Sequence, residues 1–337
     1  MGYTTELIAL MNDSLSGKVG LFAEDATKFT DQAIREAFFE LLGEDKLTYQ
    51  NYRNNKNQIF TIMENILTTN LPLAWENSVF YNQFVEIKNG ALGDANEFVV
   101  EDNSILYASR FSGNHWDIER QKLQGKKGFS VTTEWVGVRV YDELERFLKG
   151  TSTLADMMIK LQKAFQNEID TRIYTSFNGM ATYLPAKFQE SGAYDKETMS
   201  TLIQRVQTAT QKNVVLAGTK TALANIVDGM DAARMSERQK EELATKGALL
   251  DLTGLGVQAI EIPQTMVRGT YDFKVDNKSI FVLPDNEAPI KLFFEGQSRA
   301  RDLDSQQTAD MTIDSIVENK IGTGFVCSNL SGKYTIV

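Results

Sequence analysis

The stretch TLADMMIKLQKAFQNEIDTRIYTSFNG, residues 153–179, decides the fold class of this chain. Apolar side chains recur in it every three or four positions, at Leu154, Met157, Met158, Leu161, Phe165, Ile169, Ile173 and Phe177. Residues with this spacing share one face of an α-helix, so the pattern predicts a single amphipathic helix. Thr153 with Asp156 resembles a capping box, and Asn178-Gly179 favours an end. At 1.5 Å per residue, such a helix is about 37 Å long and spans a subunit.

The segment before this helix has a different period. From Phe80 to Tyr141, apolar and polar residues alternate between glycines and charged residues, which is typical of extended strands. The pattern predicts strands over residues 80–87, 97–101, 105–107 and 129–141, with turns at Asn89-Gly90 and Gly93-Asp94. A hairpin of this length cannot bury both faces within its own subunit, so we expect another chain to cover it.

The remaining segments predict smaller units. Residues 1–27 are polar and predict an arm, and helices are predicted over 30–42 and 55–68, the second ended by Asn70-Leu71-Pro72. After the long helix, helical and strand periods alternate, which predicts an α/β arrangement. Helices are expected at 196–211 and 219–227, strands at 213–217, 257–262, 279–283, 291–294 and 334–337, a polar link at 297–307, and a short strand from 309 to 317.

Composition excludes several classes of protein. The 337 residues carry a net charge of −10 and the isoelectric point is about 4.9, which argues against a surface that grips nucleic-acid phosphates. The sole cysteine, Cys327, excludes an intrachain disulfide, and its apolar neighbours predict a buried thiol. The apolar runs are too short to cross a bilayer and residues 1–6 lack a signal-peptide pattern, so we expect no membrane or secretory role.

Residues suited to catalysis or metal binding are few. The sole histidine, His115, cannot build a site that needs two histidine ligands, and we expect it in solvent or at an interface. Asp302 and Asp304 lack the glycine of a calcium loop, and the pair at positions 228 and 231 has no accompanying nucleophile. We therefore expect no metal, no cofactor and no enzymatic activity.

One motif leaves an alternative open. Gly218-Thr219-Lys220-Thr221 follows an apolar strand and superficially resembles a phosphate-binding loop. A true loop of this kind would indicate a nucleotide-binding α/β enzyme. The motif lacks the upstream glycine and the order Gly-Lys-Thr that such a loop requires. The pattern favours an ordinary strand-to-helix turn with Thr219 as the helix N-cap.

The order of these parts resembles a known family. An arm, a long extended loop, a long helix, an α/β unit and a return into strands beside the helix resemble the layout of tailed-bacteriophage major capsid proteins with the Hong Kong 97-type fold. Three stretches carry the resemblance: Trp135-Val136-Gly137-Val138 leading to Leu144-Glu145-Arg146-Phe147-Leu148, Val214 to Ala222, and Thr308 to Ile336. The resemblance covers most of the chain from about Phe80 onward.

The resemblance implies an α+β fold made of an N-terminal arm, an extended β-hairpin loop, a long spine helix, a peripheral domain and an α/β axial domain. Residues 1–79 correspond to the arm and its helices, and residues 80–134 to the extended loop. The peripheral domain with the spine helix corresponds to 135–183 and 298–337, and the axial domain to 184–297.

The function implied is structural. Copies of the chain are expected to form hexamers and pentamers of an icosahedral phage head around double-stranded DNA, without sequence-specific DNA binding. Assembly is expected in the host cytoplasm, with portal and scaffolding or decoration proteins as partners. An encapsulin-like compartment shell, which encloses cargo proteins in place of DNA, is the alternative within the same fold.

The extended loop supplies the candidate contact residues. Those expected to contact a neighbouring subunit are His115, Trp116, Lys122, Lys126, Lys127 and Phe129. In some members of the family that this chain resembles, an extended-loop lysine is joined covalently to an asparagine of a neighbouring subunit. Lys122, Lys126 or Lys127 with Asn319 or Asn329 provides the groups for such a bond here, although non-covalent contact is the default expectation.

Overall fold

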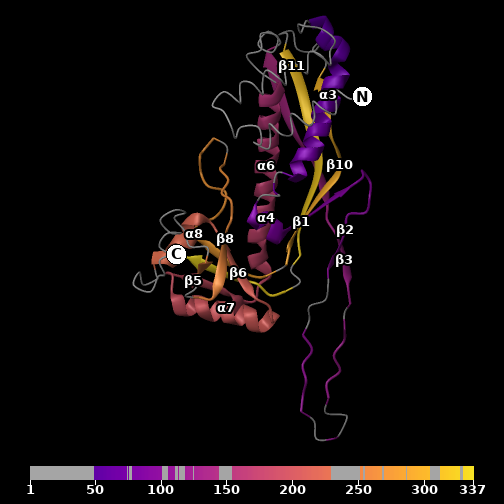
Figure 1. Ribbon diagram of the computed structural model, residues 1–337. Helices are drawn as coiled ribbons and strands as arrows, with labels where there is room; N and C mark the ends of the chain where they lie inside the picture. Colours follow the sequence, from indigo (N-terminus) through magenta and orange to yellow (C-terminus); the bar gives the residue numbers. More distant parts are fainter. Residues whose placement is uncertain are drawn as a thin grey trace.

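The computed structural model describes residues 49–73, 75, 78–100, 105–110, 113, 118–123, 125–143, 154–228, 251–252, 255–267, 269–285, 287–303, 312–326 and 329–337. The expectations for residues 1–48, for Thr153, for His115 and Trp116, and for Cys327 lie outside these residues. In the described part, one β-sheet lies alongside a long helix, a second sheet lies at the lower end of that helix, and a two-stranded ribbon continues into a projecting loop (Figure 1).

Helix α3, Tyr49–Leu73, is longer at both ends than the predicted 55–68. Its apolar side enters the core through Ile59, Ile62, Met63, Ile66, Leu67 and Leu71. Pro72 lies in its last turn and the helix ends one residue later. Proline has no backbone N–H to donate to the carbonyl of the preceding turn, so the helix ends beside Pro72, a few residues later than predicted.

The strand predicted over residues 80–87 is wrong at its start. Val79–Phe84 forms the short helix α4, and strand β1, Val85–Gly90, begins only after it. Phe80, Tyr81 and Phe84 are all buried. A helical turn carries these three rings to one side, whereas an extended chain would place adjacent side chains on opposite faces.

A partly buried network of hydrogen bonds joins this helix and Trp75 to the long helix. Trp75 Nε1 and the Tyr81 hydroxyl donate hydrogen bonds of 3.0 and 2.6 Å to Oδ1 of Asp170. Burial raises the pKa of the Asp170 carboxyl and also raises the pKa of Tyr81. The two donors satisfy a carboxylate that an apolar core would otherwise disfavour.

The first sheet has four strands in the order β1-β10-β11-β4. Strand β10 is Ile290–Leu303, β11 is Thr312–Phe325 and β4 is Thr133–Glu143. β1 pairs with β10 in parallel, and the other two pairs are antiparallel. The strands predicted at 291–294 and 309–317 are therefore too short, because residues 297–303 and 318–325 continue them. The polar residues 297, 299 and 301 are exposed, as one open face of an antiparallel sheet permits.

A β-bulge divides β10. Glu295 pairs with Lys320 and Arg299 pairs with Glu318, so three residues of β10 stand opposite Asn319 alone. Gly296 adopts a φ of 80° there, a conformation that glycine tolerates. β1 pairs no further than residue 295, and α3 supplies partners to the uncovered edge. Ser298 N–H donates to Thr68 Oγ1 at 3.0 Å, and Ala300 N–H donates to Glu64 Oε1 at 2.8 Å.

Helix α6, Leu154–Gly179, confirms the helix predicted from the opening stretch. The predicted stripe is buried at Met158, Leu161, Phe165, Ile169, Ile173 and Phe177. Its 26 residues correspond to about 39 Å. It contacts α3, β4, β10 and β11, and Figure 1 shows it running from the first sheet to the second.

The second sheet has six strands in the order β5-β12-β9-β6-β8-β7. These strands are β5 (Gln189–Gly192), β6 (Val214–Gly218), β7 (Asp251–Leu252), β8 (Val257–Glu261), β9 (Ser279–Pro284) and β12 (Gly332–Ile336). Helices α7, Lys196–Thr210, and α8, Lys220–Asp228, match the predicted ranges within one residue. Two short 3-10 helices, Met180–Tyr183 and Ala186–Phe188, connect α6 to β5.

Both faces of the second sheet are covered. Val214 and Leu216 of β6 pack with α7 and α8, whereas Val215 and Ala217 belong to the core that also contains Phe177 of α6. Every residue of β6 and β9 is buried. Strands covered on two sides read as unbroken apolar runs, which explains why these two strands were predictable from sequence.

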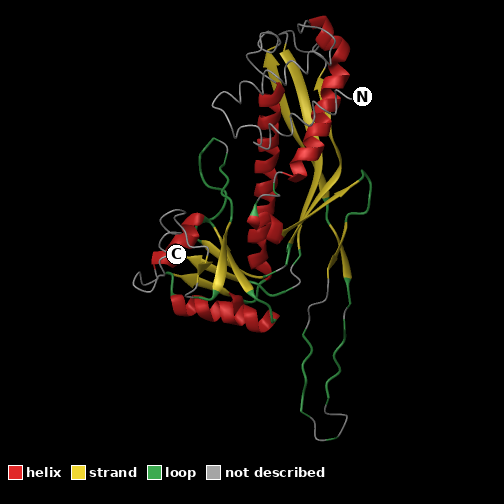
Figure 2. Cartoon of the chain, in the orientation of Figure 1, coloured by secondary structure: helices red, strands yellow, loops and turns green. Residues whose placement is uncertain are grey.

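The strands of each sheet come from distant parts of the chain. β1 falls within residues 80–134 but pairs in the first sheet, and β12 falls within 298–337 but pairs in the second. Figure 2 shows the C-terminal strand in the second sheet, where β12 lies between β5 and β9. Strand pairing over long sequence separations decides these assignments. Among the helices that the structure describes, none combines the length and apolar character needed to cross a membrane.

Candidate functional site

The extended loop, residues 91–132, projects away from both sheets (Figure 1). It starts as a ribbon of two strands, β2 (Glu97–Val100) and β3 (Lys127–Ser130), which pair antiparallel with Phe98 opposite Phe129. Beyond this ribbon the described residues belong to no strand, so the strand predicted at 105–107 is wrong. The strand predicted over 129–141 is two strands, β3 and β4, because the chain leaves the ribbon at residues 131–132 and enters the first sheet.

A glutamine side chain holds the two arms of the loop together beyond the ribbon. Tyr107 N–H donates to Gln121 Oε1 at 2.8 Å, and Gln121 Nε2 donates to the Tyr107 carbonyl at 2.6 Å. The side-chain amide thus replaces one pair of ladder hydrogen bonds. This closure keeps the arms adjacent where no backbone ladder exists.

The loop exposes large apolar side chains, those of Val99 and Phe129 on the ribbon and those of Leu106, Tyr107, Ile118 and Leu123 beyond it. Lys122, Lys126 and Lys127 are exposed beside them. Four of the six predicted contact residues, including Phe129, are thus described and lie at the surface of the loop. Apolar side chains gathered on a projection mark a surface that a partner covers.

The root of the loop is packed. Phe98, Val131 and Phe293 of β10 form a small core of their own, and the rings of Phe98 and Phe293 meet edge to face at 6.4 Å. Asn96 joins the two arms here, since its Nδ2 donates to the Val131 carbonyl at 2.6 Å. Lys88 Nζ lies 4.4 Å from the centroid of the Phe98 ring. The loop is therefore exposed at its tip and anchored at its base.

Two glycines of β11 let the root approach closely. A Cβ added at Gly322 would lie 2.9 Å from the Thr132 carbonyl oxygen and 2.9 Å from Val131 Cγ1. One added at Gly324 would lie 2.9 Å from Val131 Cγ2. All three separations are shorter than non-bonded carbon and oxygen atoms tolerate, so this contact requires glycine.

Glu295 connects both ends of the loop to the sheet. Its buried carboxylate accepts hydrogen bonds from Gly93 N–H at 3.0 Å, from the Thr133 hydroxyl at 2.5 Å and from Lys320 Nζ at 2.7 Å. The hydrogen bond from Lys320, followed by those from Thr133 and Gly93, lowers the pKa of this carboxyl to about 2. Gly93 lies at the start of the loop and Thr133 follows its end, so one ionised side chain holds the two arms at their origin.

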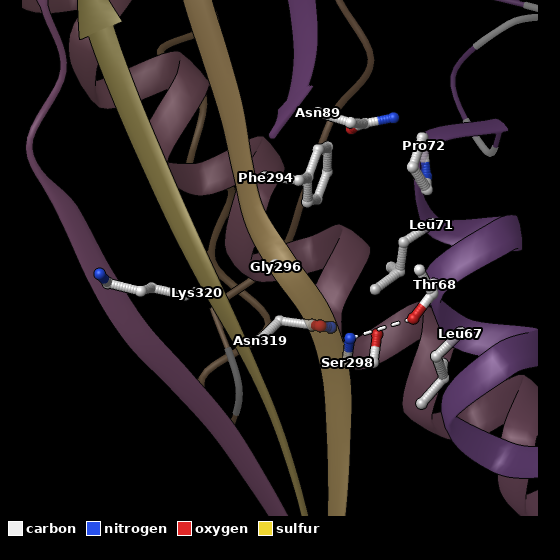
Figure 3. Close-up of a pocket in the computed structure, with 10 residues that line it drawn as sticks. All are labelled: Leu67, Thr68, Leu71, Pro72, Asn89, Phe294, Gly296, Ser298, Asn319 and Lys320. Atoms are coloured by element: carbon white, nitrogen blue, oxygen red, sulfur yellow. Dashed lines mark hydrogen bonds between the residues drawn. The ribbon is translucent and has the colours of Figure 1, made fainter. Parts of the chain in front are cut away.

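Asn319, one of the two asparagines singled out from the sequence, is 6% exposed. It faces the bulge of β10 at a cavity of about 80 Å³ bounded by α3, and Figure 3 shows its amide pointing toward Ser298 and Thr68. Among the described residues its Nδ2 has no hydrogen-bond partner. The neighbouring Lys320 side chain points away from this cavity and reaches Glu295.

The other asparagine, Asn329, lies elsewhere. Its Nδ2 donates to Glu287 Oε1, which also accepts a hydrogen bond from Lys212 Nζ at 3.2 Å. Asn319 lies in β11 beside α3 and Asn329 is bound to Glu287, whereas Lys122 belongs to the extended loop, which projects away from both sheets (Figure 1). The structure thus brings neither asparagine together with the loop lysines of the same chain.

The phosphate-loop alternative corresponds to a simple turn. Gly218 ends β6, Lys220 begins α8 and is exposed, and Ala222 N–H donates to Thr219 Oγ1 at 3.3 Å. Thr219 is therefore the helix N-cap, as predicted.

The two acidic candidates are described only in part. Asp231 of the pair at positions 228 and 231, and Asp304 of the calcium-loop candidate, lie outside the described residues.

Sequence reasoning missed the root of the loop. A charged residue after two phenylalanines, in Phe293-Phe294-Glu295-Gly296, was a usable signal, because a carboxylate in a buried strand requires donors. Gly322-Thr323-Gly324 was another, since paired glycines within a strand indicate close approach by another segment. Neither signal identifies its partner across more than 150 residues.

The comparison with protein families assigns the class of this protein. Residues 6–332, nearly the whole chain, match a family of phage capsid proteins, so this chain is a capsid protein and not only similar to one in layout. The chain belongs to the family described as "SPbeta prophage-derived putative capsid protein YonB". This match confirms the resemblance to phage capsid proteins. No curated protein matches the chain.

Several solved structures are similar to this one at low sequence identity. The capsid of Cyanophage P-SCSP1u is 9% identical, with 77% of this chain and 88% of that chain covered and a TM-score of 0.49. A structure described as "Mycobacterium phage Bobi" is 9% identical, with 78% of this chain and 91% of that chain covered and a TM-score of 0.48. A virus-like particle from Pyrococcus furiosus is 8% identical, with 81% and 98% covered and a TM-score of 0.44.

Proposed function

We propose that this chain is the major structural subunit of a phage head, forming hexamers and pentamers of an icosahedral shell that encloses double-stranded DNA. The observation that carries the proposal is the extended loop, which is anchored by Glu295 and the Phe98 core and exposes apolar side chains beyond them. A capsid protein is surrounded by copies of itself, and these copies are the partners that such a loop requires.

Each part of the fold takes a role in this proposal. Helix α6 acts as the spine, the first sheet forms the peripheral domain with it, and the second sheet forms the axial domain that contains most of residues 184–297. Residues 1–79 supply the arm. The extended loop, within the range 80–134, reaches over a neighbouring subunit. Because the root is rigid, the loop can present its outer residues without a large entropic cost on assembly.

The contact residues of the proposal are those of the loop. Phe129 and the exposed aliphatic residues supply apolar contact area, with His115 and Trp116 in the same segment. Lys122, Lys126 and Lys127 carry positive charge on a chain whose net charge is −10. Basic side chains on a projecting loop are attracted to the acidic body of a neighbouring copy, which favours correct docking.

The net negative charge of the chain also bears on how the proposed shell would hold DNA. An acidic shell protein does not bind phosphates strongly, so packaged DNA can move during packaging and release. Portal and scaffolding or decoration proteins are the expected partners, with assembly in the host cytoplasm. Catalysis and cofactors have no part in this proposal.

Purified particles test the proposal directly. We expect negative-stain images of particles from phage-producing cells to show closed shells in which this chain is the main protein. We also expect a 260 nm absorbance that survives nuclease treatment of intact shells. Shells that hold protein and no DNA would identify a compartment instead. A chain that remains monomeric over a wide range of salt and protein concentration would refute assembly.

A loop variant tests the observation behind the proposal. Replacing residues 108–120 with a four-residue Gly-Ser linker removes the tip but keeps the Tyr107–Gln121 closure and the whole root. We expect the subunit to fold, with an unchanged circular-dichroism spectrum, yet to form no shells. Normal assembly of this variant would show that the loop is not the contact element.

A further inference from the structure

The connection between β8 and β9, residues 262–278, forms a second projection. Its arms meet at an isolated antiparallel bridge between Met266 and Phe273. Val267 N–H donates to the Asp272 carbonyl at 2.8 Å, and Lys274 N–H donates to the Thr265 carbonyl at 2.9 Å. Figure 1 shows this connection, in orange, rising from the second sheet beside α6. We call its outer part, residues 266–273, the β8–β9 tip.

The base of this projection is fixed to the long helix. Val275 is buried in the main core. Lys274 Nζ donates to Thr171 Oγ1 at 2.7 Å, and Asp276 N–H donates to the Tyr174 hydroxyl at 2.6 Å. Gln264 adds bonds across the two arms, to Val275 and Asn277. The base is thus a rigid platform, and the tip is presented from it in a defined direction.

The described residues of the β8–β9 tip are largely apolar and exposed. Its large apolar side chains are 57%, 37%, 82% and 54% exposed at Met266, Val267, Tyr271 and Phe273. Tyr271 also adopts a φ of 59°, a left-handed conformation that is unfavourable for a bulky residue other than glycine. Strained backbone conformations cluster at functional positions, which makes the largely exposed Tyr271 a candidate contact residue.

We propose that the β8–β9 tip is a second contact surface between copies of this chain, seated on a neighbouring subunit in the shell. The inference rests on the proposed function, because it takes the neighbour to be another copy. Tyrosine, phenylalanine and methionine are enriched at the centres of protein interfaces, where charged residues are depleted. The tip follows this composition in a chain that is otherwise strongly acidic.

The charge of the tip favours a second copy over nucleic acid. Residues 266–273, Met-Val-Arg-Gly-Thr-Tyr-Asp-Phe, contain one arginine and one aspartate and therefore have no net charge. Subunits of net charge −10 repel one another, so they approach most easily where each presents a neutral apolar surface. DNA binding would require a surplus of basic side chains, which the tip does not have.

Oxidation of methionine measures whether the tip is covered. Among the described methionines, Met266 is exposed whereas Met63, Met158, Met180 and Met199 are buried, so the buried four serve as internal controls. Mild peroxide treatment followed by mass spectrometry should oxidise Met266 in unassembled subunits and spare it in intact shells. We expect protection of about tenfold or more. Equal oxidation of Met266 in both states would overturn the proposal while leaving shell assembly, and hence the proposed function, intact.

Two substitutions separate contact from folding. Tyr271→Gly relieves the left-handed strain, so the free subunit should unfold at an equal or higher temperature. Loss of the aromatic anchor should still lower the association constant of assembly by about tenfold. Tyr271→Phe keeps the ring and should assemble as the wild type does. Unimpaired assembly of Tyr271→Gly would overturn the proposal, as would loss of assembly together with lowered subunit stability.

A photoreactive residue identifies the partner. Benzoylphenylalanine at position 271, activated in intact shells, should join two copies of the chain, and the linked peptide locates the acceptor surface. Links only to a different protein, or none, would overturn the assignment to a second copy. If the wild-type chain forms no shells at all, the proposed function fails first and this inference fails with it.

Discussion

Phe177 near the end of α6 and Phe281 in β9 pack edge to face, with ring centroids 4.4 Å apart and an interplanar angle of 75°. The same core contains Ile62 of α3 and Leu292 of β10, so side chains from both sheets meet in one hydrophobic cluster. The long helix is therefore part of a shared core and not a linker between independent domains. A substitution that weakens the core at one sheet is therefore expected to destabilise the other sheet as well.

Removing one of these rings tests the shared core. Phe281→Ala leaves a cavity between α6 and the second sheet and should lower the free energy of unfolding by about 3–5 kcal/mol. Urea unfolding of unassembled subunits, followed by circular dichroism and by tryptophan fluorescence, to which the buried Trp75 contributes, should show one transition. Tyr183→Ala, at a side chain that is 81% exposed, should change stability by less than about 0.5 kcal/mol. Separate transitions for the two probes would contradict a single core.

A methyl group at Gly322 should push the loop root off the sheet. Its Cβ would lie 2.9 Å from the Thr132 carbonyl oxygen, a backbone atom that cannot move without displacing the loop. We expect Gly322→Ala to cost about 1–3 kcal/mol and to speed amide exchange at Val131. Gly179→Ala is the matched control, because a Cβ added there would meet nothing within 4 Å and the φ of Gly179 is −60°. Equal stability of the two variants would show that the root is loosely packed.

Glu295 should make stability depend on acid pH. Its folded-state pKa of about 2 lies below the ordinary 4.5, so between these values the unfolded chain binds more protons than the folded one. The contribution of Glu295 is fully present above about pH 4.5 and is lost as the pH falls toward 2. We would measure the midpoint temperature of thermal unfolding at several pH values in this window. Plotted against pH, it should have a shallower slope for Glu295→Gln than for the wild-type subunit.

Lys320→Met checks the cause of that shift. Removing the ammonium that donates to Glu295 should reduce the slope of unfolding temperature against pH. Because the two side chains act as a pair, the double variant should reduce this slope little more than either single variant does. An unchanged slope in both single variants would assign the acid sensitivity to other groups.

Covalent linkage between subunits is tested by denaturing gels. We expect mature particles heated in SDS to run as a single band at 37.8 kDa, because Asn319 is buried beneath α3 and Asn329 is bound to Glu287. A ladder of higher bands would instead support a bond between a loop lysine and an asparagine, formed with loss of ammonia. Asn319→Asp and Asn329→Asp would then identify the asparagine, and arginine at positions 122, 126 and 127 in turn would identify the lysine.

The sequence predicts much of the candidate site, but it does not predict the contacts that attach the loop to the first sheet. The projecting loop, its exposed lysines and Phe129 follow from alternation, glycine and charge between residues 91 and 132. The β8–β9 tip was missed because its apolar residues, Met266 to Phe273, are few and show no period. Only the structure shows that nothing in the described part of the chain covers them.

Sequence alone determined the elements whose burial pattern is local and regular. Helix α6, helix α7 and the doubly covered strands β6 and β9 follow from apolar spacing, because that spacing reports which faces of one segment are buried. Tertiary structure decided what each segment packs against. It turned Val79–Phe84 into a helix, extended β10 and β11 through polar residues, and placed Glu295 between Gly93, Thr133 and Lys320. Those outcomes depend on contacts between residues far apart in the chain, whose free energies no local pattern of side chains records.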